Sequence, residues 1–247
     1  MIEQLRQTLR ALEKPAGFEG EAGAMPFGIG AIDAALGGGL PRGALHEIAA
    51  ASEAHVAAAT GFTLALAARE RARVCWVAAD MALAESGALY GGGLEPLGLA
   101  PERLLSVAAA RPRDLLWAME EALRCRAVHA VIGEWRHGAI DAVAVRRLSL
   151  AAADSGTLAF MLRAKPAADT STAATRWIVG ATPSAATPHG SGAPRFAAHL
   201  IRNRRGPLGS WILEWSDSDE RFSLAHAQPV AVPALDRPHR PGTRRAA

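Results

Sequence analysis

Short apolar runs alternate along most of the chain with longer segments that have one apolar face. The runs that predict buried strands cover residues 44–48, 73–79, 104–108, 128–133 and 157–162. The segments that predict helices cover residues 29–36, 56–71, 113–126 and 142–153. Mostly apolar strands separated by helices are typical of βαβ units whose parallel sheet is buried on both faces. We therefore expect an α/β domain over residues 28–228, with a mostly parallel sheet flanked by helices.

The pattern changes after about residue 164. Strand-like segments now follow one another across turns rich in Gly, Pro, Ser and Asp, without helices between them. These segments cover residues 176–179, 195–201, 210–215 and 221–224. Short strands joined in this way are typical of antiparallel pairing. We expect an antiparallel C-terminal extension of the same sheet from about residue 176.

The two ends of the chain differ from this core. Residues 1–14 predict an amphipathic helix that ends at Pro15, and a Gly/Ala-rich linker follows, so residues 1–27 form an N-terminal helix and linker. The apolar side chains on one face of this helix are Ile2, Leu5, Leu9 and Leu12. The helix either packs on its own domain or docks on a partner, and the pattern leaves both interpretations open. Residues 229–247 are rich in Pro, Arg and Ala, which is typical of a disordered tail.

Composition places the protein among globular chains, because 50% of its 247 residues are hydrophobic and 21% are charged. Its two cysteines, Cys75 and Cys125, are too few for a disulfide framework or a four-cysteine metal site, and they fit a reducing compartment. The longest nearly apolar stretch, residues 56–68, is too short to span a bilayer, and the N-terminus lacks the pattern of a secretory signal. We expect a cytoplasmic protein without a membrane partner.

Positive charge is carried almost entirely by arginine. The net charge is +3, and of the 27 basic residues only Lys14 and Lys165 are lysines. Two explanations are open for this bias: codon usage in a GC-rich genome and recognition of phosphate groups, for which arginine is well suited. Composition alone favours codon usage. The basic side chains that are candidates for nucleic-acid contact lie just after predicted strands: Arg163, Lys165, Arg202, Arg204 and Arg205.

The densest basic run, residues 202–205, has a structural alternative, namely a solvated turn or ion pairs to nearby carboxylates. The acidic candidates for these pairs are Glu214, Asp217 and Asp219. Three tryptophans, Trp177, Trp211 and Trp215, interleave with this region. They either stack on bases or, as is more usual for strand tryptophans, belong to the core.

Ligands of open α/β sheets bind at the carboxyl ends of strands, so the segment after Ile48 is where a phosphate-binding loop would lie. Such a loop reads Gly-x-x-x-x-Gly-Lys-Ser/Thr, whose lysine contacts the phosphates. This chain has Ala49-Ala-Ala-Ser-Glu-Ala-His-Val instead, without a lysine and with Glu53 adding negative charge. Thr60, Thr63 and His55 are the remaining candidates for contact with a nucleotide, but they do not replace the lysine. We predict a loop that binds neither ATP nor Mg²⁺, and no cofactor.

Two acidic residues follow other apolar strands, Asp80 after residues 73–79 and Glu134 after residues 128–133. Carboxylates at neighbouring strand ends can orient water or hold hydrated Mg²⁺, and equally they can be ordinary solvated residues. Without the lysine we favour the second interpretation. The eight histidines show no paired metal-ligating spacing, and no Gly-x-Ser-x-Gly elbow is present. We therefore assign no catalytic residue and no metal site.

Three segments resemble parts of bacterial RecA, in the same order. The first, Leu36-Gly-Gly-Gly-Leu-Pro-Arg-Gly43, is similar to the segment that leads into the RecA P-loop. The strands that end at Asp80 and Glu134 stand where RecA-like proteins have a catalytic Glu and the Walker B acid, and the loop after Leu162 stands where RecA has a DNA-binding loop. The resemblance covers about residues 28–163 and implies a RecA-like core, although the phosphate-binding lysine has no counterpart.

Further segments are similar to the ImuA family, RecA-like proteins of bacterial SOS mutagenesis cassettes. These segments are Thr175-Arg-Trp177, Gly192-Ala-Pro-Arg-Phe196 and Arg202-Asn-Arg-Arg-Gly206 with Trp211 and Glu214-Trp215. The resemblance implies a role in DNA repair by damage-induced translesion synthesis, at the nucleoid when DNA is damaged. The partners it implies are an inactive Y-family-like protein, ImuB, an error-prone C-family DNA polymerase and, less directly, RecA and DNA.

Two classes of function follow from these observations. The first is a non-catalytic RecA-fold adaptor that acts through protein–protein contacts, because the fold is kept while the phosphate loop is degenerate. The alternative is a divergent protein that binds single-stranded DNA or modulates RecA, with or without ATP.

Overall fold

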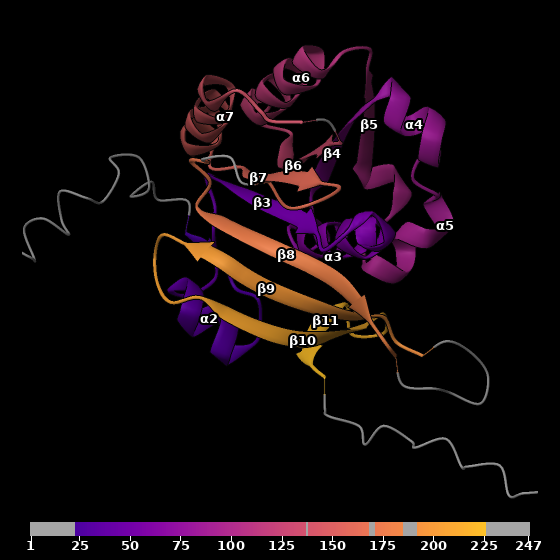
Figure 1. The fold of residues 1–247 in the computed structure, drawn as a ribbon, viewed down its shortest axis with the longest axis vertical. Helices are drawn as coiled ribbons and strands as arrows, with labels where there is room; N and C mark the ends of the chain where they lie inside the picture. Colours follow the sequence, from indigo (N-terminus) through magenta and orange to yellow (C-terminus); the bar gives the residue numbers. More distant parts are fainter. Residues whose placement is uncertain (1–22, 137, 168–170, 185–191, 226–247) are drawn as a thin grey trace, which may run out of the picture.

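The computed structural model describes residues 23–136, 138–167, 171–184 and 192–225 (Figure 1). The helix predicted at residues 1–14 and the tail at residues 229–247 lie outside these ranges. Nine strands of the described chain form one sheet, in the order β11-β10-β9-β8-β3-β7-β6-β4-β5. A separate two-stranded ribbon pairs β1 (Ala24–Met25) with β2 (Leu40–Pro41). Because Met25 and Phe27 are buried in the core, the folded unit includes residues that the sequence assigned to the linker.

Six neighbouring strands of the sheet are parallel, which confirms the predicted α/β class. They are β3 (Ala44–Ala50), β4 (Arg73–Ala79), β5 (Leu104–Ala109), β6 (Val128–Trp135), β7 (Leu158–Arg163) and β8 (Thr175–Thr182). In β3 and β7 every residue is buried, as expected for strands covered on both faces.

The C-terminal extension is antiparallel and consists of β9 (Arg195–Asn203), β10 (Gly209–Ser216) and β11 (Arg221–Leu224). One part of the prediction is wrong, because β8 is parallel to β3 and antiparallel only to β9. The chain passes from β7 across β3 to reach β8, so that β8 keeps the direction of the core strands. A pattern of short strands does not reveal which strand becomes the neighbour.

Helices cover both faces of the core. They are α2 (Gly30–Leu36), α3 (Val56–Ala68), α4 (Asp80–Ser86), α5 (Gly91–Leu94), α6 (Pro112–Arg124) and α7 (Ala142–Ser155). Short 3₁₀ turns are η1 (Glu53–His55), η2 (Glu95–Leu97) and η3 (Pro101–Arg103). On one face, α2 and α3 close an aromatic-rich cluster that includes Phe62, Trp177 and Trp215. On the other face, α6 and α7 pack on β3 to β7 through side chains such as Met119 and Leu148.

Two glycines are required by close approaches in this packing. Gly39, in the turn before β2, has φ +133°, and a Cβ there would lie 2.3 Å from the carbonyl oxygen of Met25. Gly133, inside β6, leaves room for Met119 of α6, whose sulfur would lie 2.0 Å from an added Cβ. The Gly-Gly-Gly segment that resembles RecA thus serves the turn that joins α2 to β2.

Candidate functional site

The segment at the position of a phosphate loop runs from the end of β3 through η1 into α3. Its backbone and side chains are already bound to β8: the N–H of Ala51 donates to the carbonyl of Val179 at 2.8 Å, and the N–H of Ala181 donates to Nδ1 of His55 at 3.1 Å. The N–H of His55 in turn donates to the carbonyl of Ser52 at 2.9 Å. The N–H groups of Ala51 and His55 are thus occupied, whereas a phosphate-binding loop directs its backbone N–H groups at the ligand.

The two threonines of α3 are in different environments. Thr63 is fully buried, and its hydroxyl donates to the carbonyl of Ala59 one turn earlier, at 2.7 Å. This hydroxyl is therefore held within the helix. Thr60 is half-buried and lines a pocket of about 420 Å³ between α3, α4 and α5. Of the three remaining nucleotide-contact candidates, the structure thus places Thr60 at this pocket, Thr63 inside the helix and His55 against β8.

The two predicted acids lie near the carboxyl ends of two neighbouring strands, since β4 and β6 are paired. Asp80 is the exposed first residue of α4. Glu134 was expected beyond its strand but lies inside β6, where it is 6% exposed. Its Oε1 accepts a hydrogen bond of 2.7 Å from Nε of Arg136, and Nη1 of Arg136 donates to Oγ of Ser86 at 2.6 Å.

The sequence analysis missed Arg136, which determines the electrostatics of this pocket. Glu134 and Arg136 are the charged members of the pocket lining, and they neutralise each other. A carboxylate that is bound by a guanidinium is a poor ligand for Mg²⁺. Within the described ranges, no group of three His, Cys, Asp or Glu residues is placed to hold a metal ion. The spacing Glu-x-Arg at the end of a predicted strand was the available signal.

The basic candidates do not form one patch. Arg163 is the last residue of β7 and pairs in register with Ala49 near the end of β3, whereas Asn203 is aligned through Thr175 with His46 near the start of β3. Arg163 and Lys165 thus lie at the opposite end of the strands from residues 202–205. The spacing of these residues in the sequence does not predict this separation, because the separation depends on the direction in which β9 runs.

The individual environments of these arginines also differ from expectation. Arg163 was predicted in a loop but is 5% exposed, and its Nη2 donates to the carbonyl of Gly138 at 3.1 Å. Arg202 lies inside β9 and donates to the carbonyl of Ser171 at 2.6 Å. Arg204 and Arg205 are exposed in the turn after β9, and Lys165 is exposed as well. Burial and the nearby charge of Arg202 lower the pKa of Arg204.

Two of the three acidic candidates near residues 202–205 pair with other arginines. Glu214 pairs with Arg195 at 2.6 Å, and Asp219 pairs with Arg221 at 3.3 Å. The tryptophans follow the core interpretation: Trp177 and Trp215 are each 1% exposed, and Trp211 packs against the same cluster. In this structure Trp177 and Trp215 present no face on which a base could stack.

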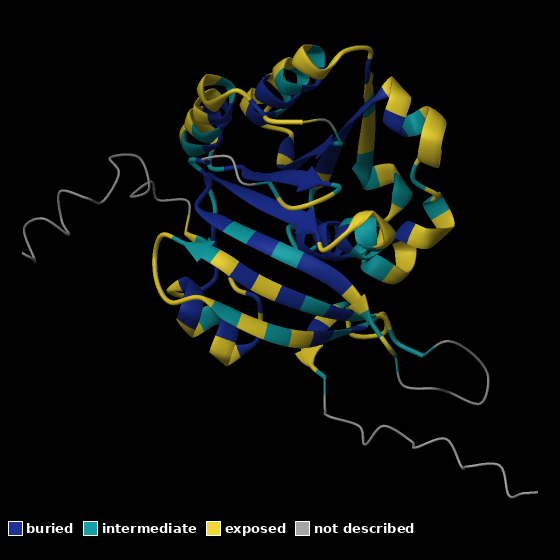
Figure 2. Cartoon of the chain, in the orientation of Figure 1, coloured by how far each residue is buried: buried dark blue, intermediate teal, exposed yellow. Residues whose placement is uncertain are grey.

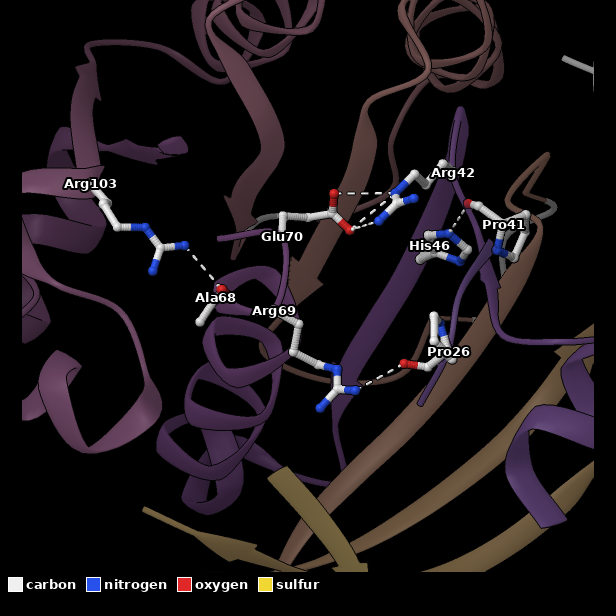
Figure 3. Close-up of polar contacts among 8 residues, drawn as sticks. All are labelled: Pro26, Pro41, Arg42, His46, Ala68, Arg69, Glu70 and Arg103. Atoms are coloured by element: carbon white, nitrogen blue, oxygen red, sulfur yellow. Dashed lines mark hydrogen bonds and ion pairs between the residues drawn. The ribbon is translucent and has the colours of Figure 1, made fainter. Parts of the chain in front are cut away.

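Several arginines stabilise the fold by binding carbonyl groups, as Figure 3 shows around the end of α3. Arg103 donates to three carbonyls there, those of Ala68, Ala72 and Gly98, at 3.0–3.1 Å. Arg69 donates to the carbonyl of Pro26 at 3.1 Å. A cation at a helix C-terminus also interacts favourably with the helix dipole. Much of the arginine content therefore has a structural use that composition does not reveal.

Buried polar groups also occur at the start of β3. His46 is fully buried, its Nδ1 lies 2.8 Å from Oγ1 of Thr175, and its Nε2 lies 3.0 Å from the carbonyl oxygen of Pro41. Burial lowers the pKa of His46 to about 4, so the ring is neutral at pH 7. Glu47 Oε2 lies 2.8 Å from Nε of Arg176, as a buried ion pair without the angle of a hydrogen bond.

No protein-family model matches the chain. Protein ImuA of two strains of Caulobacter vibrioides is 32% identical to it over 209 residues, which cover 77% of this chain and 82% of theirs. The chain belongs to the ImuA family.

The fold of this ImuA-family chain is similar to that of a solved recombinase. The crystal structure of the RadB recombinase superposes with a TM-score of 0.56, covering 81% of this chain and 99% of that chain at 13% identity. This similarity confirms the RecA-like fold predicted from the sequence. None of the helices in the described ranges combines the length and the apolar character that a bilayer crossing needs.

Proposed function

We propose that this ImuA-family protein is a non-catalytic RecA-fold adaptor in damage-induced, error-prone translesion DNA synthesis. Its partners in this proposal are an ImuB-like protein and an error-prone C-family polymerase, met in the cytoplasm and at the nucleoid when DNA is damaged. The observation that carries the proposal is that the segment after β3, where a RecA-like protein binds a nucleotide, lacks the groups for this binding. No lysine is present there, the loop is bound to β8, and Glu134 is bound to Arg136.

The edge of the sheet at β5 supports a docking role. β5 is the last strand of the sheet, and its sequence, Leu-Leu-Ser-Val-Ala-Ala, contains no charge and no proline. Leu105 on this strand is 54% exposed, and Trp117 on α6, which packs beside β5, is 62% exposed. Proteins usually protect a free edge with charges or proline, so an uncharged edge fits pairing with an extended segment of another protein.

The test is binding of the purified full chain to an ImuB-like protein and to the polymerase, measured by biolayer interferometry. The variant carries Leu105→Lys and Ser106→Lys, which place two charges on the edge. We expect at least about a tenfold loss of affinity for one partner. The matched control is Leu150→Lys on α7, which is similarly exposed at 53% and far from this edge in sequence. Equal affinity of the edge variant and the wild type would refute docking at β5.

The absence of nucleotide chemistry is tested by titrating the protein with a fluorescent ATP analogue, with and without Mg²⁺. We expect no saturable binding at high-micromolar protein. Saturable, Mg²⁺-dependent binding that is lost in Asp80→Ala or Glu134→Ala would instead show a divergent nucleotide site and would refute the non-catalytic proposal.

Exposure of Arg204 and Arg205 in one turn favours a second candidate, binding of single-stranded DNA. Such binding is electrostatic and weakens with salt. In this case Arg204→Ala with Arg205→Ala lowers affinity for an oligonucleotide and reduces its salt dependence, whereas Leu105→Lys with Ser106→Lys does not lower it. The adaptor proposal tolerates weak DNA binding without requiring it.

A further inference from the structure

One side of β8, β9 and β10 forms a sheet face that no helix of the described ranges covers. His199 of β9 lies opposite Ile178 of β8 and Ser210 of β10, and Ala197 lies opposite Ile212. Residues opposite each other in a sheet project from the same side. We call these five residues the open face. The core cluster beneath α6 and α7 contains no residue of these three strands, so that layer of helices ends at β3.

Aliphatic side chains are exposed to water on the open face and beside it. Ile212 is 42% exposed, and Ile201 and Leu208, which flank the β9–β10 turn, are 44% and 60% exposed. Figure 2 shows exposed and half-buried positions alternating with buried ones along most of β9, whereas in β10 buried positions occur only in its second half. Two ion pairs of the described residues lie on this side: Arg195 with Glu214, at the opposite end of the strands from Leu208, and Arg176 with Glu47, beside β3. Exposed aliphatic side chains on adjacent strands indicate contact with a further element.

The N-terminal segment joins the fold at one end of this face. The carbonyl of Gly23 accepts a hydrogen bond of 3.2 Å from the N–H of Arg42, just before β3 begins. The start of β3 lies beside the start of β8 and the end of β9, because His46 is aligned with Thr175 and Thr175 with Asn203. The chain therefore leaves the described fold near the turn that carries Ile201 and Leu208 (Figure 1).

The length of the N-terminal segment suits the open face. Residues 1–22 lie outside the described ranges, and residues 1–14 predict a helix with four aliphatic side chains on one side. A helix of this length measures about 21 Å, and a strand of the length of β10 measures about 26 Å. The connecting residues 15–22 span at most about 28 Å when extended. This reach is sufficient to place the helix along the strands.

We infer that residues 1–14 pack their aliphatic stripe on the open face of the same molecule. There they supply the helical layer that α6 and α7 supply on the rest of the sheet. A short tether keeps the helix at a local concentration in the millimolar range, which favours the same molecule over a separate one. The inference is independent of the adaptor proposal, because it concerns the free protein. A second copy of the chain and a partner protein are the competing occupants.

The experiment uses the full chain and the fluorescent dye 8-anilinonaphthalene-1-sulfonate, which binds exposed apolar surface. One variant carries Leu5→Asp and Leu9→Asp on the aliphatic stripe. The matched control carries Gln7→Asp and Ala11→Asp, which add the same charge to the opposite side of the helix. We expect dye fluorescence to rise about twofold or more in the first variant and to stay unchanged in the control. Adding Ile212→Asp to the first variant removes most of the rise, because the dye site is the open face.

Light scattering after size exclusion identifies the occupant. We expect one monomeric mass for the wild type and all variants. A wild-type dimer that Leu5→Asp with Leu9→Asp converts to monomer would overturn the inference in favour of a second copy. Unchanged dye fluorescence in that variant would also overturn it, and a simultaneous loss of partner affinity would assign the helix to a partner. A rise that Ile212→Asp does not reduce would place the helix elsewhere on the molecule.

Discussion

The two halves of the sheet solve the problem of burial differently. β7, in the parallel half, is buried at every position because helices cover both of its faces. β9, in the antiparallel half, alternates between buried and accessible positions because the helices of the described ranges, α2 and α3, cover only one of its faces. A strand covered on both sides needs a continuous apolar run, whereas a strand covered on one side needs apolar residues at every second position. The apolar pattern of each strand therefore indicates whether helices cover one or both of its faces.

Polar groups differ between the halves for the same reason. In the parallel half, His46, Glu47 and Glu134 are buried, and each lies against a polar or charged partner. In the extension, His199 and Ser210 bond to each other at the surface. In the parallel half, removing one partner leaves the other polar group buried without a hydrogen bond or water. In the extension, the remaining group is still solvated. Stability should thus respond to substitutions in the two halves unequally.

The largest contrast is expected for core and open-face truncations. Phe160→Ala in β7 empties a fully buried position and should cost about 4 kcal/mol of unfolding free energy. Ile212→Ala on the open face should cost less than about 1 kcal/mol in the Leu5→Asp with Leu9→Asp background, where the inferred cover by residues 1–14 is lost, measured by urea denaturation. A cost of about 2 kcal/mol or more in that background would break the comparison, because another part of the molecule would then cover Ile212.

The next contrast concerns ion pairs. Glu47→Gln removes one partner of the buried pair with Arg176 and should cost about 3 kcal/mol. Glu214→Gln removes one partner of the more accessible pair with Arg195 and should cost less than about 1 kcal/mol. Denaturant midpoints of both variants check this order. Equal losses would show that the two halves exclude water equally.

The pH dependence of stability should come largely from His46. Its pKa is lowered to about 4 in the folded protein, from 6.5 in the unfolded chain, so the unfolded chain binds more protons between these values. Stability is therefore lost as the pH falls from 6.5 to 4, by about 2–3 kcal/mol. His46→Gln should flatten this slope, whereas the control His199→Gln on the exposed face should keep it. A slope that survives in His46→Gln would assign it to other groups.

The smallest contrast concerns two strand glycines. Gly133→Ala places a Cβ against Met119 and should cost about 1–2 kcal/mol, since a long side chain can move aside. Gly180→Ala in β8 meets its nearest neighbour, Cβ of Ala51, at 3.4 Å and should change stability by about 0.5 kcal/mol or less. Thermal unfolding distinguishes the two. Combining Gly133→Ala with Met119→Ala tests whether the clash is the cause.

Some features of the candidate site were visible in the sequence and others were not. The missing lysine and the acidic Glu53 are read directly from the residues after Ile48. The contact of Ala51 with Val179 was not predictable, because these residues are far apart in the chain and meet only when β8 lies beside β3. The ion pair between Glu134 and Arg136 was not predictable either, because it depends on the directions of both side chains at the end of β6, which a sequence pattern does not specify.

The sequence by itself determined which core strands are continuously apolar and the order of the main elements, because hydrophobic periodicity reflects how many sides of an element are buried. The RecA-like character of the core was indicated by the resemblance of three segments to RecA. Tertiary structure alone decided the direction of β8, the separation of Arg163 from residues 202–205, and the burial of Arg163. These properties depend on which strands become neighbours. Packing between residues that are distant in the chain determines which strands become neighbours, and local sequence patterns do not predict it.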